Sequence, residues 1–131
     1  KEAKTFHEKC DGEGPTIFII HSEDGSKFGG YTDLDWKKIG WQKGEGNSFL
    51  FSLVRDRKYT CNENRFEINC DPYHFCIFGA GDIRISNNWE GNSYSKFPHS
   101  YGKNENAIEG ELAPFIFKPI EIEVFKVKKL I

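Results

Sequence analysis

Alternating hydrophobic and polar positions along the chain predict a series of short β-strands. The clearest alternation spans residues 48–55, where Phe49 and Phe51 point to one side and Leu50 points to the other. Residues 120–124 alternate isoleucine or valine with glutamate, which predicts a half-buried strand. The full set of expected strands is 16–21, 27–32, 48–55, 58–61, 65–69, 75–78, 82–86 and 120–124.

Two of these strands carry further signals. Residues 17–20 are apolar at every position, which predicts a strand that is covered on both faces. A hairpin turn at 22–26 follows, with Gly25 at the position that needs a positive φ. Gly29 and Gly30 lie inside the returning strand, and glycines there indicate a β-bulge or the close approach of a neighbouring element.

The remaining segments are expected to be a helix and two long loops. Residues 1–10 place Ala3, Phe6 and Cys10 on one helical face, and the glycines and proline of 11–15 end that helix. The first loop, 33–46, carries two tryptophans and has a polar, glycine-rich end at 43–47 that should be exposed and mobile. The second loop, 87–111, is rich in Asn, Gly and Ser, and a loop of that length is usually functional or mobile.

Short strands separated by turn signals indicate a mainly β (α+β) protein with an antiparallel β-sandwich. The chain has 131 residues, enough for one domain, and its 12 Phe without any Met suit a β-sandwich core. A net charge of -2 gives no sign of nucleic-acid binding, and no apolar run is long enough to span a membrane. The strand order cannot be derived from these patterns.

Four cysteines raise the questions of compartment and metal binding. They are fewer than small secreted scaffolds usually have, which favours free thiols in a reducing, cytoplasmic setting. Cys61, Cys70, His74 and Cys76 lie in one stretch and offer zinc-type donors, but no Cys-x-x-Cys pair is present and Cys76 sits in an apolar run. We therefore expect thiols rather than a metal site, with Cys10 and Cys61 as the exposed ones.

Patterns with catalytic potential have simpler interpretations. Residues 79–82 look like a phosphate loop, but a strand follows instead of a helix, which favours a tight turn with Asp82 bonded to local backbone. There is no Gly-x-Ser-x-Gly elbow, and no histidine has a visible acidic partner, so we expect neither catalytic residues nor cofactors.

The tryptophans are expected to fill the core or pin loops. Glu121 and Glu123 fit the solvated face of an edge strand, or an acidic stripe for a basic partner.

Five segments, in their order and spacing, resemble the TLDc domain of oxidation-resistance proteins. The resemblance covers residues 5–127, and each segment alone would be weak. The matching residues that shape the fold are Gly29, Gly30, Trp36, Gly79, Gly81, Asp82 and Glu121, and the segments are 27–31 with Trp36, 48–53, 78–85, 92–95 and 120–127.

The resemblance implies a two-sheet antiparallel sandwich flanked by short helices. It also implies a cytosolic protein with no established catalytic residues, which binds and regulates the vacuolar proton-pumping ATPase and is linked to oxidative-stress resistance. TLDc domains usually begin one helix and loop earlier, so the resemblance implies a single domain over 1–131 that is N-terminally truncated and part of a longer protein.

Three functional hypotheses follow. The first is a non-catalytic interaction domain, the second a structural component of another large assembly such as a ciliary or cytoskeletal one, and the third a thiol-dependent antioxidant enzyme. Expected exposure predicts three partner-binding surfaces. They are the Asp33–Asn47 loop, the Asn87–Gly110 loop and the basic end at Lys126, Lys128 and Lys129.

Overall fold

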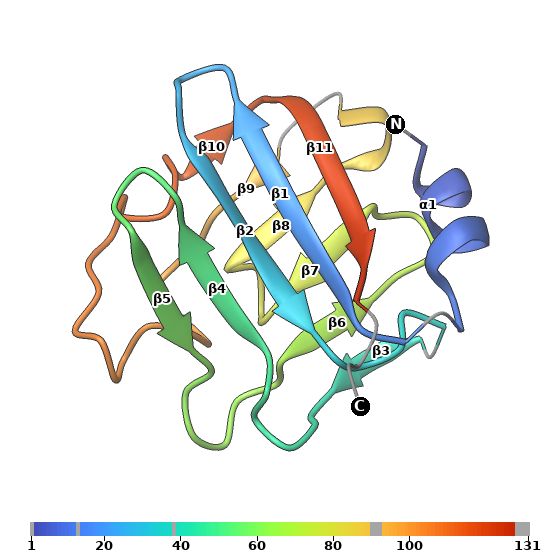
Figure 1. Ribbon diagram of the computed structural model, residues 1–131, viewed down its shortest axis with the longest axis horizontal. Helices are drawn as coiled ribbons and strands as arrows, with labels where there is room; N and C mark the ends of the chain where they lie inside the picture. The colour runs from blue at the N-terminus through green and yellow to red at the C-terminus, as the bar shows by residue number, and fades with distance from the viewer. Residues whose placement is uncertain (1, 13, 38, 90–92, 128–131) are drawn as a thin grey trace.

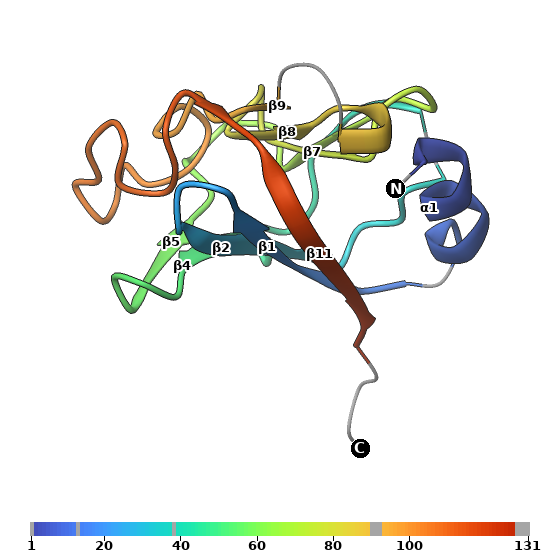
Figure 2. The ribbon, with the colours of Figure 1, turned by 90° about the horizontal axis from the view of Figure 1, so that it is seen from above.

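The computed structural model describes residues 2–12, 14–37, 39–89 and 93–127, and it shows two antiparallel sheets packed face to face (Figures 1 and 2). One sheet has the order β11 (Pro119–Lys126), β1 (Thr16–Ser22), β2 (Lys27–Thr32), β4 (Phe49–Ser52) and β5 (Arg57–Thr60). The other has the order β10 (Ile116–Phe117), β9 (Ser93–Tyr94), β8 (Ile83–Ile85), β7 (Cys76–Phe78), β6 (Ile68–Cys70) and β3 (Gly40–Gln42). The predicted antiparallel sandwich is confirmed.

A short helix, α1 (Ala3–Cys10), lies at one end of the two layers (Figure 2). Its buried residues are Ala3, Phe6 and Cys10, the face predicted from their spacing. The Phe6 ring packs on Trp36 from the first long loop, with ring centres 5.6 Å apart. A 3-10 turn, η1 (Asn87–Trp89), is the other helical element, so the described residues hold one α-helix where the resemblance implied several flanking helices.

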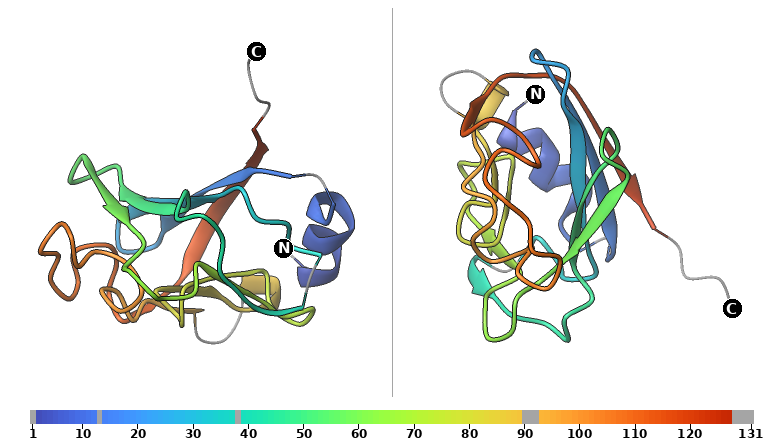
Figure 3. Two further views of the ribbon diagram at one scale, coloured as in Figure 1. Left: turned by 90° about the horizontal axis from the view of Figure 1, so that it is seen from below. Right: turned by 90° about the vertical axis from the view of Figure 1, so that its left-hand side faces the viewer.

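The core lies between the sheets. Phe18 and Ile20 of β1 are fully buried and point toward the second sheet. Ile17 and Ile19 point the other way and remain partly exposed, so the prediction that β1 is covered on both faces is wrong. No element of the described chain packs over that outer face (Figure 3).

Close approach explains the glycine pair of β2. A Cβ at Gly29 would lie 1.7 Å from the carbonyl oxygen of Phe18, and one at Gly30 would lie 2.8 Å from the ring of Phe78. The register between β1 and β2 runs without interruption, so of the two predicted explanations close approach is confirmed and no bulge is present in this pair.

Several predicted boundaries were wrong. The strand at 48–55 ends at Ser52, because the chain turns and leaves Leu53 and Val54 exposed. The first long loop contains β3, and the second contains η1 and β9. The two-residue strand β10 was not predicted. Among the described residues, the structure has no helix with the length and apolar character needed to cross a membrane.

Candidate interaction surface

A row of outward-facing residues crosses the six-stranded sheet. Ile116 pairs with Tyr94, Tyr94 with Arg84, and Arg84 with Ile77. At the far edge Trp41 pairs with Asn69. The outer row is therefore Ile116, Tyr94, Arg84, Ile77, Asn69 and Trp41. Much of it borders a shallow cavity of about 230 Å³, called here the groove, which is also lined by Asp71, His74, Ala80, Gly81 and Lys96.

Arg84 is held in the groove by its neighbours. Its Nη2 and Nε atoms lie 2.9 and 3.3 Å from Nε2 of His74, and its guanidinium lies 5.9 Å from the centre of the Tyr94 ring. A guanidinium can only donate hydrogen bonds, so His74 Nε2 accepts and the ring proton is on Nδ1. That Nδ1 atom lies 3.1 Å from the carboxylate of Asp71. His74 and Tyr94 therefore orient Arg84, which presents a permanent positive charge on this face, and Asp71 lies beside the other side of the His74 ring.

The Asp71 carboxylate beside His74 stays ionised at neutral pH. Partial burial works to raise the pKa of Asp71, but the Tyr73 N–H and the neighbouring His74 ring outweigh it and hold the pKa below its ordinary value. A negative charge thus lies beside Nδ1 of His74, although that buried nitrogen has no aligned hydrogen-bond partner among the described residues.

Exposed aromatic pairs lie at both ends of the outer row. At one edge the rings of Trp41 and Phe66 have centres 5.5 Å apart, and the two side chains are 51% and 46% exposed. At the other edge Tyr94 lies 5.6 Å from Phe115, which is half exposed. Aromatic side chains around a positively charged centre are typical of protein-binding surfaces. The arrangement suits a carboxylate flanked by apolar side chains.

The structure brings the two predicted loops to this one face. Trp41 comes from the first loop, whereas Tyr94 and Lys96 come from the second. Arg84 lies in the predicted strand 82–86, and nothing in its sequence pattern predicts this role. The predicted basic end lies elsewhere: Lys126 is exposed at the end of β11 in the other sheet, and Lys128 and Lys129 are outside the described residues.

The predicted fold residues lie in the core, in the tight turn and at a sheet edge. Trp36 is buried, and its Nε1 donates to the hydroxyl of Thr16 at 2.9 Å. Gly79 and Gly81 have φ of +63° and +109° in the turn between β7 and β8, as the tight-turn interpretation requires. Glu121 is exposed on an edge strand, which agrees with a solvated face.

Asp82 behaves differently from its prediction. Its fully buried carboxyl oxygens accept hydrogen bonds from the main-chain N–H groups of His99, Ser100 and Tyr101, at 2.9–3.1 Å. These partners are distant in sequence, so the expected bonding to local backbone was wrong. Burial raises the pKa of Asp82 above its ordinary value, although the three N–H donors work in the opposite direction.

A second buried carboxylate, Glu67, was missed. It accepts hydrogen bonds from the N–H groups of Gly44, Gly46 and Ser48, at 2.6, 3.1 and 3.2 Å. The segment 43–47 is largely exposed as predicted, but this carboxylate fastens its backbone to the body. An acidic residue just ahead of a short strand carries no sequence signal for such a role.

The cysteines form no metal site in the part of the chain that the structure describes, where no three potential ligands gather. All four are free thiols. Cys10 is buried rather than exposed as predicted, whereas Cys61 is partly exposed. Burial raises the pKa of Cys61 to about 11 and that of Cys70 to about 12, so both remain protonated at neutral pH.

Comparison with known families decides the relationship, because the TLDc domain model matches residues 1–128. The chain belongs to the TLDc family. A comparison with curated proteins found no match. The groove and the two buried carboxylates are therefore features of this TLDc domain, and the five segments on which the resemblance rested lie within the matched residues.

Proposed function

We propose that this TLDc domain is a non-catalytic protein-interaction domain that binds and regulates the vacuolar proton-pumping ATPase, in the context of oxidative-stress resistance. Family membership supports the class of partner. The oriented Arg84 in the groove, between exposed aromatic pairs, supports binding through the outer face of the six-stranded sheet. That positioned guanidinium is the observation that carries the proposal.

The groove sets the chemistry of the segment it binds. Arg84 directs Nε and one Nη toward His74, which leaves N–H donors for a carboxylate of the partner. Lys96 is exposed beside it and adds a second positive charge. Trp41 and Phe115 offer apolar surface on either side. The bound segment is an acidic residue flanked by apolar side chains, presented by a peripheral subunit of the pump.

The thiols give little support to the antioxidant alternative. Thiol chemistry needs an accessible thiolate, and three of the four cysteines are buried. The fourth, Cys61, has its pKa raised to about 11 by burial and by the nearby carboxylates of Glu67 and Asp82. The buried carboxylates that fasten the loops thus also keep the Cys61 thiol protonated.

A binding assay with purified peripheral subunits of the pump tests the proposal. We expect Arg84→Glu and Trp41→Ala each to weaken binding at least about tenfold, because the first removes the central charge of the groove and the second removes the exposed aromatic ring at its edge. Lys103→Glu is the matched control, since it reverses an exposed charge outside the groove and should leave affinity unchanged.

The possible outcomes distinguish an incorrect binding surface from an incorrect partner. If wild-type domain binds the pump and both groove variants bind equally well, the groove is the wrong surface. If wild-type domain binds no pump subunit, the partner is wrong. Recovery of tubulin or another scaffold from the native source, without pump subunits, would favour the structural alternative.

A further inference from the structure

The outer face of the five-stranded sheet carries a continuous apolar row. The strand registers place Phe125 opposite Ile17, Ile17 opposite Tyr31, and Tyr31 opposite Phe49. The rings of Tyr31 and Phe49 are stacked with centres 5.2 Å apart. Phe125 is 46% exposed, and the other members of the row are partly exposed. Contiguous apolar surface of this kind marks interaction sites when it is exposed.

A second row beside it ends in opposite charges. It runs from Glu123 through Ile19, Gly29 and Phe51 to Lys58. Glu123 and Lys58 are exposed, and they lie on the two edge strands of the sheet. The row is therefore apolar in its middle, negative at one edge and positive at the other.

This pattern is complementary to itself. A two-fold axis parallel to the strands and above β2, the central strand, sets β11 of one copy against β5 of the other. Glu123 of each copy then faces Lys58 of the other, so one contact geometry forms two ion pairs. Ile19 meets Phe51 by the same operation, and the apolar centres of the two sheets pack together. Two sheets that pack face to face with nearly aligned strands form a common arrangement.

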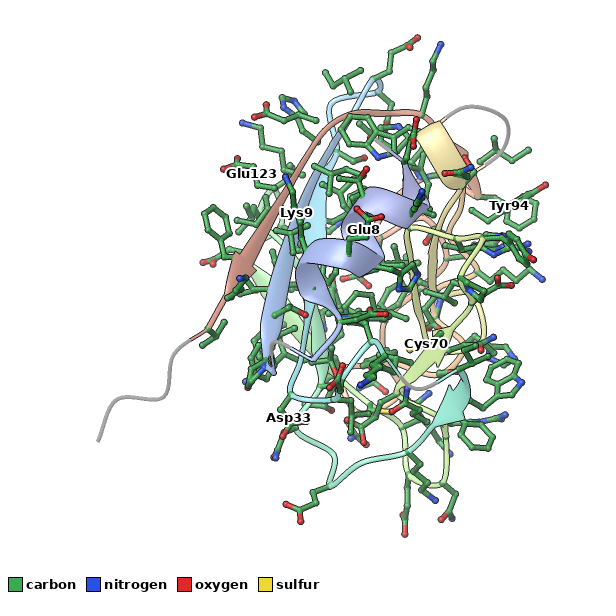
Figure 4. The ribbon with its side chains drawn as sticks, turned by 90° about the vertical axis from the view of Figure 1, so that its right-hand side faces the viewer. Glu8, Lys9, Asp33, Cys70, Tyr94 and Glu123 are labelled. Atoms are coloured by element: carbon green, nitrogen blue, oxygen red, sulfur yellow. The ribbon has the colours of Figure 1, made fainter. Side chains whose placement is uncertain are left out.

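We propose that the domain self-associates through this face to form a symmetric dimer. The dimer leaves the groove free, because Glu123 and Tyr94 lie on opposite sides of the molecule (Figure 4). The axis also brings Lys27, an exposed residue of β2, toward its copy. The contact is therefore centred on the two rows, and Lys27 opposes it.

Charge reversal with rescue tests the dimer. Sedimentation equilibrium of wild-type domain should show a reversible monomer–dimer transition. Lys58→Glu and Glu123→Lys should each raise the dissociation constant at least about tenfold, since each places like charges together twice. An equimolar mixture of the two variants should restore dimerisation, because every facing pair is then again of opposite sign. Lys27→Ala should tighten the dimer.

The controls keep the interpretation specific. Arg84→Glu, on the other sheet, should leave the dissociation constant unchanged, and circular dichroism should show that both reversal variants fold. Wild-type domain that stays monomeric up to millimolar concentration would overturn the proposal. So would single reversals without effect, or a mixture in which the two variants fail to associate.

Discussion

The main-chain N–H of Tyr101 donates to the buried carboxylate of Asp82 at 3.1 Å. The hydroxyl of Tyr101 donates to the main-chain carbonyl of Glu67 at 2.6 Å. Tyr101 thus connects Asp82 and Glu67, the two residues whose buried carboxylates fasten the long loops, since Glu67 holds Gly44 and Asp82 holds Ser100. These carboxylates use backbone donors in place of counter-charges, which fixes loops without any requirement on the loop side chains.

Asp82→Asn should destabilise the domain by about 2 kcal/mol. The carboxyl oxygens accept from three N–H groups, and an asparagine has only one oxygen and turns an NH₂ toward the remaining donors. Urea denaturation followed by tryptophan fluorescence would measure the loss. Glu121→Gln, an exposed residue on an edge strand, is the control and should change stability by less than about 0.5 kcal/mol. Equal effects of the two substitutions would show that Asp82 does not organise the loop.

Gly79→Ala should cost roughly 3 kcal/mol, and Gly46→Ala only about 1 kcal/mol. Both glycines have positive φ, so alanine meets the same kind of backbone strain at each. Only Gly79 adds a collision, because its Cβ would lie 2.4 Å from Oδ1 of Asp82 and 2.7 Å from Cβ of Ser100. Thermal unfolding of the two variants measures the difference, and similar losses would contradict the collision.

Local patterns predicted the elements that depend on neighbours in sequence. The buried face of α1 at Ala3, Phe6 and Cys10 follows from helical spacing, and the glycine pair of β2 follows from the need for close approach. Strand ends were less predictable, because Leu53 and Val54 continue an alternation that the turn interrupts. The local sequence does not indicate that these two hydrophobic residues are exposed at a turn.

The candidate surface depends on distant pairings and so was predicted only in part. Both loops were expected to offer contacts, but only the strand order places Trp41 and Tyr94 on one face. Arg84 gains its role from His74, which is ten residues away in the sequence. Glu67 and Asp82 are ordinary acidic residues in the sequence, and tertiary structure alone selects their backbone donors.

Glu111→Gln should remove the pH-dependent part of the unfolding free energy that the Glu111 carboxylate contributes. Burial works to raise the pKa of Glu111, but the Ile108 N–H and the Arg57 guanidinium outweigh it and hold the pKa below its ordinary value. A carboxyl with a lowered folded-state pKa stabilises above its unfolded value of about 4.3, and that contribution is lost as pH falls through the folded pKa. The difference in unfolding free energy between wild type and variant should be constant from pH 6 to 7 and shrink below about pH 4.3. A difference that stays constant into acid would contradict the ion pair.

The thiols should react slowly in the native state at neutral pH. Burial raises the pKa of Cys70 to about 12 and that of Cys76 well above its ordinary value, so thiolate is scarce at both positions and reagents are excluded. Cys61, the most accessible of the four, should be the first to react with iodoacetamide, but its pKa of about 11 keeps that reaction slow. Mass spectrometry of timed samples would rank the sites, with denatured protein as the control in which all four react. Rapid native labelling of Cys70 or Cys76 would show an opening of the core, and it would revive the thiol-dependent enzyme as an explanation.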